Sequence, residues 1–244
     1  MTHMARVALP TAALAALLAA CGGGGGGDAG SGAASPPPVV APAPVETGVN
    51  VAGAWKDYVT APHTWTMPGK GSDARAFELS VVMKPGAVAA FPLSGASGQT
   101  SDQSLRFAID GANTVSTDGT LYFTAADMLG VASNDGACAG ARAPMTALPT
   151  STPVGSSGAM FVLDGYAGCK TTGQRLGATT FSWSVEKDGE LVMFCITSKQ
   201  EDSSGVVKTT EVDCMETSIN GSLGGRAKFT ITKPDGNSIS GRNF

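Results

Sequence analysis

The chain has 244 residues, and its 16 Lys and Arg against 20 Asp and Glu give a formal net charge of −4. The basic residues are scattered along the chain and form no block that could neutralise a row of phosphates. Because electrostatic attraction supplies most non-specific affinity for nucleic acid, this composition excludes nucleic acid from the expected partners.

The first 20 residues contain the parts of a secretory signal. Arg6 supplies a positive charge, and an apolar run follows from Val7 to Ala20. This run is shorter than the roughly 20 apolar residues that a membrane-spanning helix needs, and it ends in small residues. We therefore expect residues 1–20 to be a signal peptide that is removed from the mature protein.

The end of this signal resembles the lipobox of bacterial lipoproteins, in the residues Leu18-Ala19-Ala20-Cys21. The resemblance implies cleavage before Cys21 and lipidation of its thiol and new amine, with fatty acids such as palmitate. Several acyl chains on one residue form a far firmer anchor than a single chain. Gly22 in place of Asp favours the outer membrane in the enterobacterial sorting pattern.

Six glycines follow the lipobox cysteine, and residues 21–47 consist mainly of Gly, Ala, Ser, Pro and Val. The lipobox and the polyglycine run together resemble the start of surface lipoproteins from neisserial and related proteobacteria. Such a composition buries too little apolar surface to fold, so residues 21–47 are expected to be a disordered tether. The expected location is the cell outer membrane, with the protein facing the periplasm or the cell surface.

Residues 48–244 are expected to form the globular domain. Tight-turn pairs recur there, with six Asp-Gly and one Asn-Gly, between short runs rich in Val, Thr, Phe and Ile. These pairs tolerate the positive φ of hairpin turns, so we expect an all-β fold: an antiparallel β-sandwich or a small β-barrel. The core-poor segment 133–158 either separates two β units, 50–132 and 158–244, or makes one long excursion from a single domain.

Four cysteines remain after the lipobox, and in an exported chain an even set indicates disulfides. They are Cys138, Cys169, Cys195 and Cys214. A loop at Ser204-Gly205 sets Cys195 opposite Cys214, which favours that pair, although the same register places Asp213 on an otherwise apolar face. All three connectivities therefore remain open.

The preceding hairpin can be derived by counting outward from a two-residue loop at Asp188-Gly189. This register pairs Val185 with Val192, Trp183 with Phe194 and Phe181 with Ile196. One face of the hairpin is then entirely large and apolar.

No catalytic residues, metal site or cofactor are predicted. His63 is the only histidine after the signal peptide, and no paired C-x-x-C motif is present. Aromatic side chains with polar edges suit recognition of a protein or glycan, and four candidate contact residues crowd together: Trp55, Tyr58, His63 and Trp65. The sequence thus predicts a binding or envelope-structural role without catalysis.

Two alternatives remain open. A cell-envelope hydrolase would require acidic side chains that converge in a cleft. Gly53-Ala54-Trp55 also resembles the G-x-W opening of lipocalins, which implies a carrier of small ligands.

Overall fold

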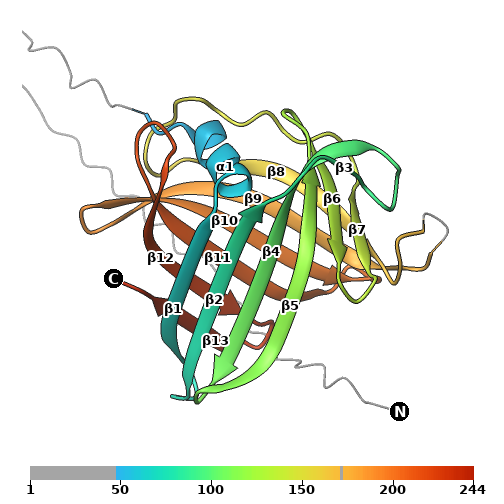
Figure 1. Cartoon of the computed structure of the whole chain (residues 1–244). Coiled ribbons are helices and arrows are strands. Elements are labelled where there is room, and N and C mark those ends of the chain that lie inside the picture. The colour runs from blue at the N-terminus through green and yellow to red at the C-terminus, as the bar shows by residue number, and fades with distance from the viewer. Residues whose placement is uncertain (1–47, 171–172) are drawn as a thin grey trace, which may run out of the picture.

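The computed structural model describes residues 48–170 and 173–244 and contains one helix and thirteen strands (Figure 1). The first elements are α1 (Val51–Thr60), β1 (His63–Gly71), β2 (Ala76–Pro85), β3 (Ala89–Ala90), β4 (Ser97–Ile109), β5 (Ala112–Phe123) and β6 (Met128–Ser133). The others are β7 (Cys138–Ala141), β8 (Ser157–Tyr166), β9 (Arg175–Asp188), β10 (Leu191–Asp202), β11 (Val207–Thr217), β12 (Leu223–Thr232) and β13 (Ser238–Arg242).

Twelve of the strands form a closed antiparallel barrel. Chain neighbours pair with each other, β1 pairs with β13, and β2 pairs with β4, while the two-residue β3 is an extra strand on the edge of β4. The expected β-barrel is therefore confirmed and the expected β-sandwich is wrong. A sandwich needs two separate sheets, and closure through β1 and β13 leaves only one.

The main hydrophobic core of the protein lies on the inner wall of the barrel. Five residues of the main core cluster show which side chains point inward. They occupy positions that face each other across neighbouring strands, or positions two residues from such a pair: Trp65, Leu79, Phe194, Met215 and Phe229. Because side chains alternate between the two faces of a strand, these residues determine which other positions of the same strands point inward. We call the space that the inner wall encloses the lumen.

Helix α1 covers one end of the barrel, which we call the capped end (Figure 1). The side-chain oxygen of Asn50 accepts a hydrogen bond from the Gly53 amide at 2.8 Å, as expected for a helix N-cap. The Asp57 carboxylate accepts a hydrogen bond from the Leu223 amide at 2.9 Å and so ties the helix to the start of β12. The buried side chains of the helix follow the spacing of a single face: Val51, Ala54, Tyr58 and Val59.

The Asn220-Gly221 turn packs directly against the start of α1. Gly221 has a φ of 87°, and a β-carbon there would lie 2.5 Å from the backbone nitrogen of Ala54. Glycine is therefore needed at this position for its backbone conformation and for the close approach of the turn. This contact holds the helix over the barrel.

The β9–β10 hairpin differs from the predicted register by two residues. Ile196 pairs with Trp183 and Phe194 with Val185, because the two-residue loop is Gly189-Glu190. Gly189 at the first loop position has a φ of 61°, which suits a type II′ turn. A shift of two preserves every face assignment, so the predicted apolar face remains correct.

Both disulfides follow the favoured connectivity. Cys138 is bonded to Cys169, and Cys195 is bonded to Cys214 across the β10–β11 pair. The predicted opposition of Cys195 and Cys214 is confirmed. A bulge after Gln200 then shifts the pairing, so that Glu201 lies opposite Val207.

Segment 133–158 contains the end of β6, all of β7 and the start of β8, and the strands before and after it belong to the same sheet. At the capped end, Val49 forms an isolated bridge with Thr152, and the Ala52 amide donates a hydrogen bond to the Pro149 carbonyl. The segment thus connects two barrel strands and contacts the start of α1.

Within residues 48–170 and 173–244, no helix is long and apolar enough to cross a membrane. The predicted signal peptide, lipobox Cys21 and tether lie outside the described residues.

Candidate functional site: the barrel lumen

The lumen contains a cavity of about 210 Å³ in the half of the barrel away from α1. Its lining residues all occupy inward positions on three consecutive strands: Thr179, Ser198, Gln200, Thr209 and Glu211. Four of them carry neutral polar groups and the fifth carries a carboxyl group. The cavity therefore has a polar wall, whereas the same strands nearer the capped end contribute core residues such as Trp183 and Phe194.

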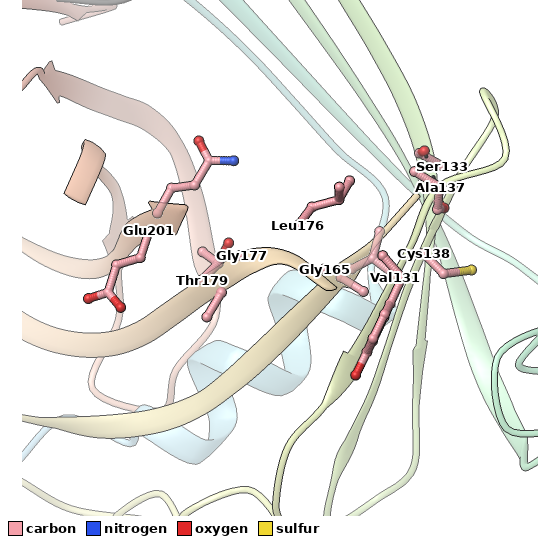
Figure 2. A pocket seen from close by; sticks show the side chains of 13 residues that line it. Val131, Ser133, Ala137, Cys138, Gly165, Leu176, Gly177, Thr179 and Glu201 are labelled. Carbon is pink, nitrogen blue, oxygen red and sulfur yellow. Dashed lines mark hydrogen bonds between the residues drawn. The ribbon is translucent and has the colours of Figure 1, made fainter. Parts of the chain in front are cut away.

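A second cavity of about 260 Å³ shares Thr179 and Gln200 with the first. Figure 2 shows its lining, with Val131, Ser133 and Gly165 from β6 and β8 on one side and Thr179 and Glu201 from β9 and β10 on the other. Leu176 projects between these two groups (Figure 2). The shared residues place the two cavities next to each other.

Two carboxyl groups face the lumen from β11. Asp213 pairs with Ile196 and Phe229, and Glu211 pairs with Ser198 and Ile231, so both acids occupy inward positions. They are two residues apart on one strand, which separates their α-carbons by roughly 6.7 Å. Both side chains therefore extend from the same wall of the barrel.

The protein environment disfavours ionisation of both groups. Burial raises the pKa of Asp213 well above its usual range, and the negative charge of Glu211 raises this pKa further. Burial likewise raises the pKa of Glu211. Neither side chain has a hydrogen bond or ion pair within the described part of the chain, and Oδ1 of Asp213 is buried without a partner.

Tyr58 of helix α1 contacts an inward residue of the barrel. Its hydroxyl oxygen accepts a hydrogen bond from Nε2 of Gln103, an inward residue of β4, at 3.1 Å. Burial raises the pKa of the Tyr58 phenol, and the negative charges of Asp213 and Glu211 act in the same direction. The phenol therefore stays protonated and keeps an O–H group that can donate a hydrogen bond.

All four aromatic residues predicted as ligand contacts lie together at the capped end. Trp55 stacks on Tyr58 with ring centroids 5.8 Å apart, Tyr58 stacks on Trp65 at 6.1 Å, and His63 stacks on Trp65 at 4.7 Å. Tyr58 and Trp65 are buried, and the Trp65 indole donates a hydrogen bond to the Gly224 carbonyl. Their contact with a ligand stays a prediction.

Within the described residues, several carboxylates on the outer wall form ion pairs, unlike the two acids in the lumen. Asp118 bonds to Arg106, Asp164 bonds to Arg142 and Arg175, and Glu216 bonds to Arg226. The Arg142 hydrogen bond is the main cause that lowers the pKa of Asp164, to about 2. These outward acids have cationic partners, whereas the described residues supply none to the two acids in the lumen.

One other group of ligand-type residues lies close together in the described structure, namely Glu186, Cys195 and Cys214. Both sulfurs are joined in a disulfide, so they are not thiolates, the form of cysteine that binds metal.

The acids and hydroxyls of the lumen were not predicted as site residues. One signal of the site was present in the sequence, because the register that opposes Cys195 and Cys214 places Asp213 beside Ile196 on an apolar face. That conflict identifies the polar site in the structure. The hydroxyls and amide of the cavity carried no comparable signal, since such residues are equally common on outward faces.

Comparisons of the chain with protein-family models, with curated proteins and with solved structures found no match.

Proposed function

We propose that this protein binds a small organic molecule in the lumen of its barrel. The observation that carries the proposal is the cavity beside Glu211, whose lining residues all point inward. Ligand sites are typically concave and contain a few polar groups in largely apolar surroundings. An amphipathic molecule fits such a lumen.

The size of the barrel supports this function. Eight strands enclose a space that side chains just fill or that holds one small ligand, and the diameter grows with strand number. Twelve strands enclose more space, and here α1 contributes Tyr58 to the core at one end. The other half retains cavities.

Binding is favoured over hydrolysis by the position of the two acids. Glycoside hydrolysis by a carboxyl pair requires groups that flank the scissile bond. Glu211 and Asp213 lie two residues apart on one strand and reach a ligand from one side. They therefore suit recognition of a polar group better than acid and base catalysis on opposite faces.

A matched pair of variants tests the binding function. Thr179 faces the cavity and Thr180 faces outward on the same strand, so Thr179→Phe fills the cavity and Thr180→Phe leaves it open. The uncharged dye N-phenyl-1-naphthylamine gains fluorescence in apolar sites, and we expect saturable binding to the parent protein and to Thr180→Phe. Binding should be lost in Thr179→Phe. Equal binding to both variants would place the dye site elsewhere and refute the proposal.

We also propose that the protein is a lipoprotein of the cell outer membrane, anchored through Cys21. The lipobox and the polyglycine run support this attachment. Because Val49 pairs with Thr152 beside α1, the chain enters the barrel at its capped end. Mass spectrometry should find an acylated N-terminal peptide that begins at Cys21 and disappears in Cys21→Ala, and an unmodified parent peptide would contradict the anchor.

A further inference from the structure

The two acids in the lumen have an unmet electrostatic requirement. Glu211 lines the cavity, and Oδ1 of Asp213 is buried without a hydrogen-bond partner among residues 48–170 and 173–244. Buried charges in proteins are normally paired, and an unpaired buried polar group calls for an explanation such as a missing ion or ligand. In the outer wall the paired carboxylates Asp118, Asp164 and Glu216 meet this requirement with arginines.

We infer that the ligand of the lumen is an organic cation, a compact amine whose ammonium group lies between Glu211 and Asp213. This inference rests on the proposed binding function and specifies its ligand class. An ammonium group offers N–H donors and a positive charge at once, so it supplies the missing hydrogen-bond partner of Asp213, and its charge favours the ionised form of both acids.

Apolar side chains on other parts of the inner wall suit the rest of such a molecule, and Ile231 pairs directly with Glu211. On the inner wall, Phe77 and Phe107 pair with neighbouring inward positions and stack with ring centroids 5.4 Å apart. Ile231 and Ile239 also face inward, are partly buried and pack against the main core. These side chains offer apolar surface to a hydrocarbon body, while the acids hold its charged group.

A metal ion fits the site less well. Calcium prefers six to eight oxygen ligands, and magnesium prefers strict octahedral geometry. The lumen wall presents two carboxyl groups from one strand, with neutral hydroxyls beside only one of them. The compact amine is therefore the better match in charge and in donor number.

Three adamantane derivatives of one shape and different charge test the inference: 1-aminoadamantane, 1-adamantanol and adamantane-1-carboxylate. In isothermal titration calorimetry at pH 7, we expect the amine to bind the parent protein about tenfold or more tightly than the alcohol. The carboxylate should bind more weakly than the alcohol. Separate titrations with calcium and magnesium chloride should give no saturable binding.

Neutral variants assign this preference to the acids. Glu211→Gln and Asp213→Asn should each weaken amine binding by about tenfold while the affinity of the alcohol changes less than about twofold. Glu216→Gln removes an outward acid of the same strand and should change neither affinity. If Asp213→Asn folds poorly, Glu211→Gln alone still tests the inference, because Glu211 lies at the cavity surface.

Each contrary result has a distinct meaning. If the alcohol binds as tightly as the amine, or the carboxylate binds best, the cationic ligand class is wrong while the cavity function stands. Saturable binding of calcium or magnesium that displaces the amine would replace the organic cation with a metal. Failure of every organic probe and of the neutral dye to bind the folded parent protein overturns the binding function itself.

Discussion

The acidic pair should make the barrel more stable at mildly acidic pH than at neutral pH. Asp213 has a raised pKa in the folded protein, so the folded state binds more protons than the unfolded state at intermediate pH. Under this condition the free energy of unfolding falls as pH rises above the unfolded value, near 3.9 for Asp, until the folded pKa is reached. The pair therefore stabilises the fold below this interval and loses that contribution across it.

The magnitude follows from linkage. One carboxyl that is protonated only in the folded state changes the free energy of unfolding by about 1.4 kcal/mol per pH unit. For a chain of this length, that corresponds to a shift in Tm of about 3–6 °C per pH unit. The acids with cationic partners do not mask the effect, because the pKa values of Asp118, Asp164 and Asp202 are lowered and their stabilisation is lost only below about pH 4.

Urea denaturation between pH 4.5 and 6.5 measures this slope. The free energy of unfolding of the parent protein should fall with pH, and the slope should be shallower by up to about 1.4 kcal/mol per pH unit in Asp213→Asn. Glu216→Gln, which removes an acid with a lowered pKa from the same strand, should keep the parental slope. Parallel curves for the parent protein and Asp213→Asn would show that Asp213 ionises normally and would refute the reasoning.

Three further predictions concern stability. Replacing Cys138 and Cys169 together by Ser should cost about 3–4 kcal/mol in urea denaturation, because the bond closes a separation of 31 residues, and an unchanged midpoint would contradict this. Asn50→Ala removes the cap of α1 and should cost about 0.5–2 kcal/mol, measured in the same way, whereas no loss would show that the cap is dispensable. Gly111→Ala places a side chain on a residue whose φ is 79° and should lower Tm by an amount equivalent to about 1 kcal/mol or more. Gly225→Ala is the control, because a β-carbon there meets no atom within 4 Å. An equal Tm in the two variants would contradict the strain at Gly111.

Local structure was largely predictable from the sequence. The Asp110-Gly111 loop has positive φ at both residues and joins β4 to β5, as expected for a type I′ hairpin. The opposition of Cys195 and Cys214 followed from counting along two strands. Both results depend on residues close in sequence, where turn chemistry and alternation suffice.

Closure of the barrel was not predictable in the same way. It depends on the pairing of β1 with β13, elements at opposite ends of the domain, and a sandwich contains the same local hairpins. Asp118-Gly119 and Asp164-Gly165 also lie within strands instead of turns. Their aspartates form ion pairs with arginines on the outer wall. Whether an Asp-Gly pair lies in a turn or within a strand therefore depends on tertiary contacts that the dipeptide does not show.

Helix α1 was missed although its signals are present. Asn50 precedes apolar residues at positions 51, 54, 55, 58 and 59, which is the spacing of one helical face. The helix has only ten residues, and long windows dilute so short a pattern. As a consequence, the sequence did not predict that Tyr58 lies on a helix that covers one end of the barrel.

The disulfide next to the acids explains how they are kept in the lumen. Cys214 follows Asp213 directly, faces outward and is bonded to Cys195, so the β10–β11 register is covalently fixed at that point. A slip of one residue would move both acids to the outer wall, where water would solvate them. The covalent bond prevents this slip, so the barrel keeps in its interior two carboxyl groups that have no partner in the described part of the chain, at a cost in stability. A bound cation would offset this cost by pairing with the two carboxyl groups. The buried acids Glu211 and Asp213, which destabilise the fold, are therefore also the strongest indication of its function.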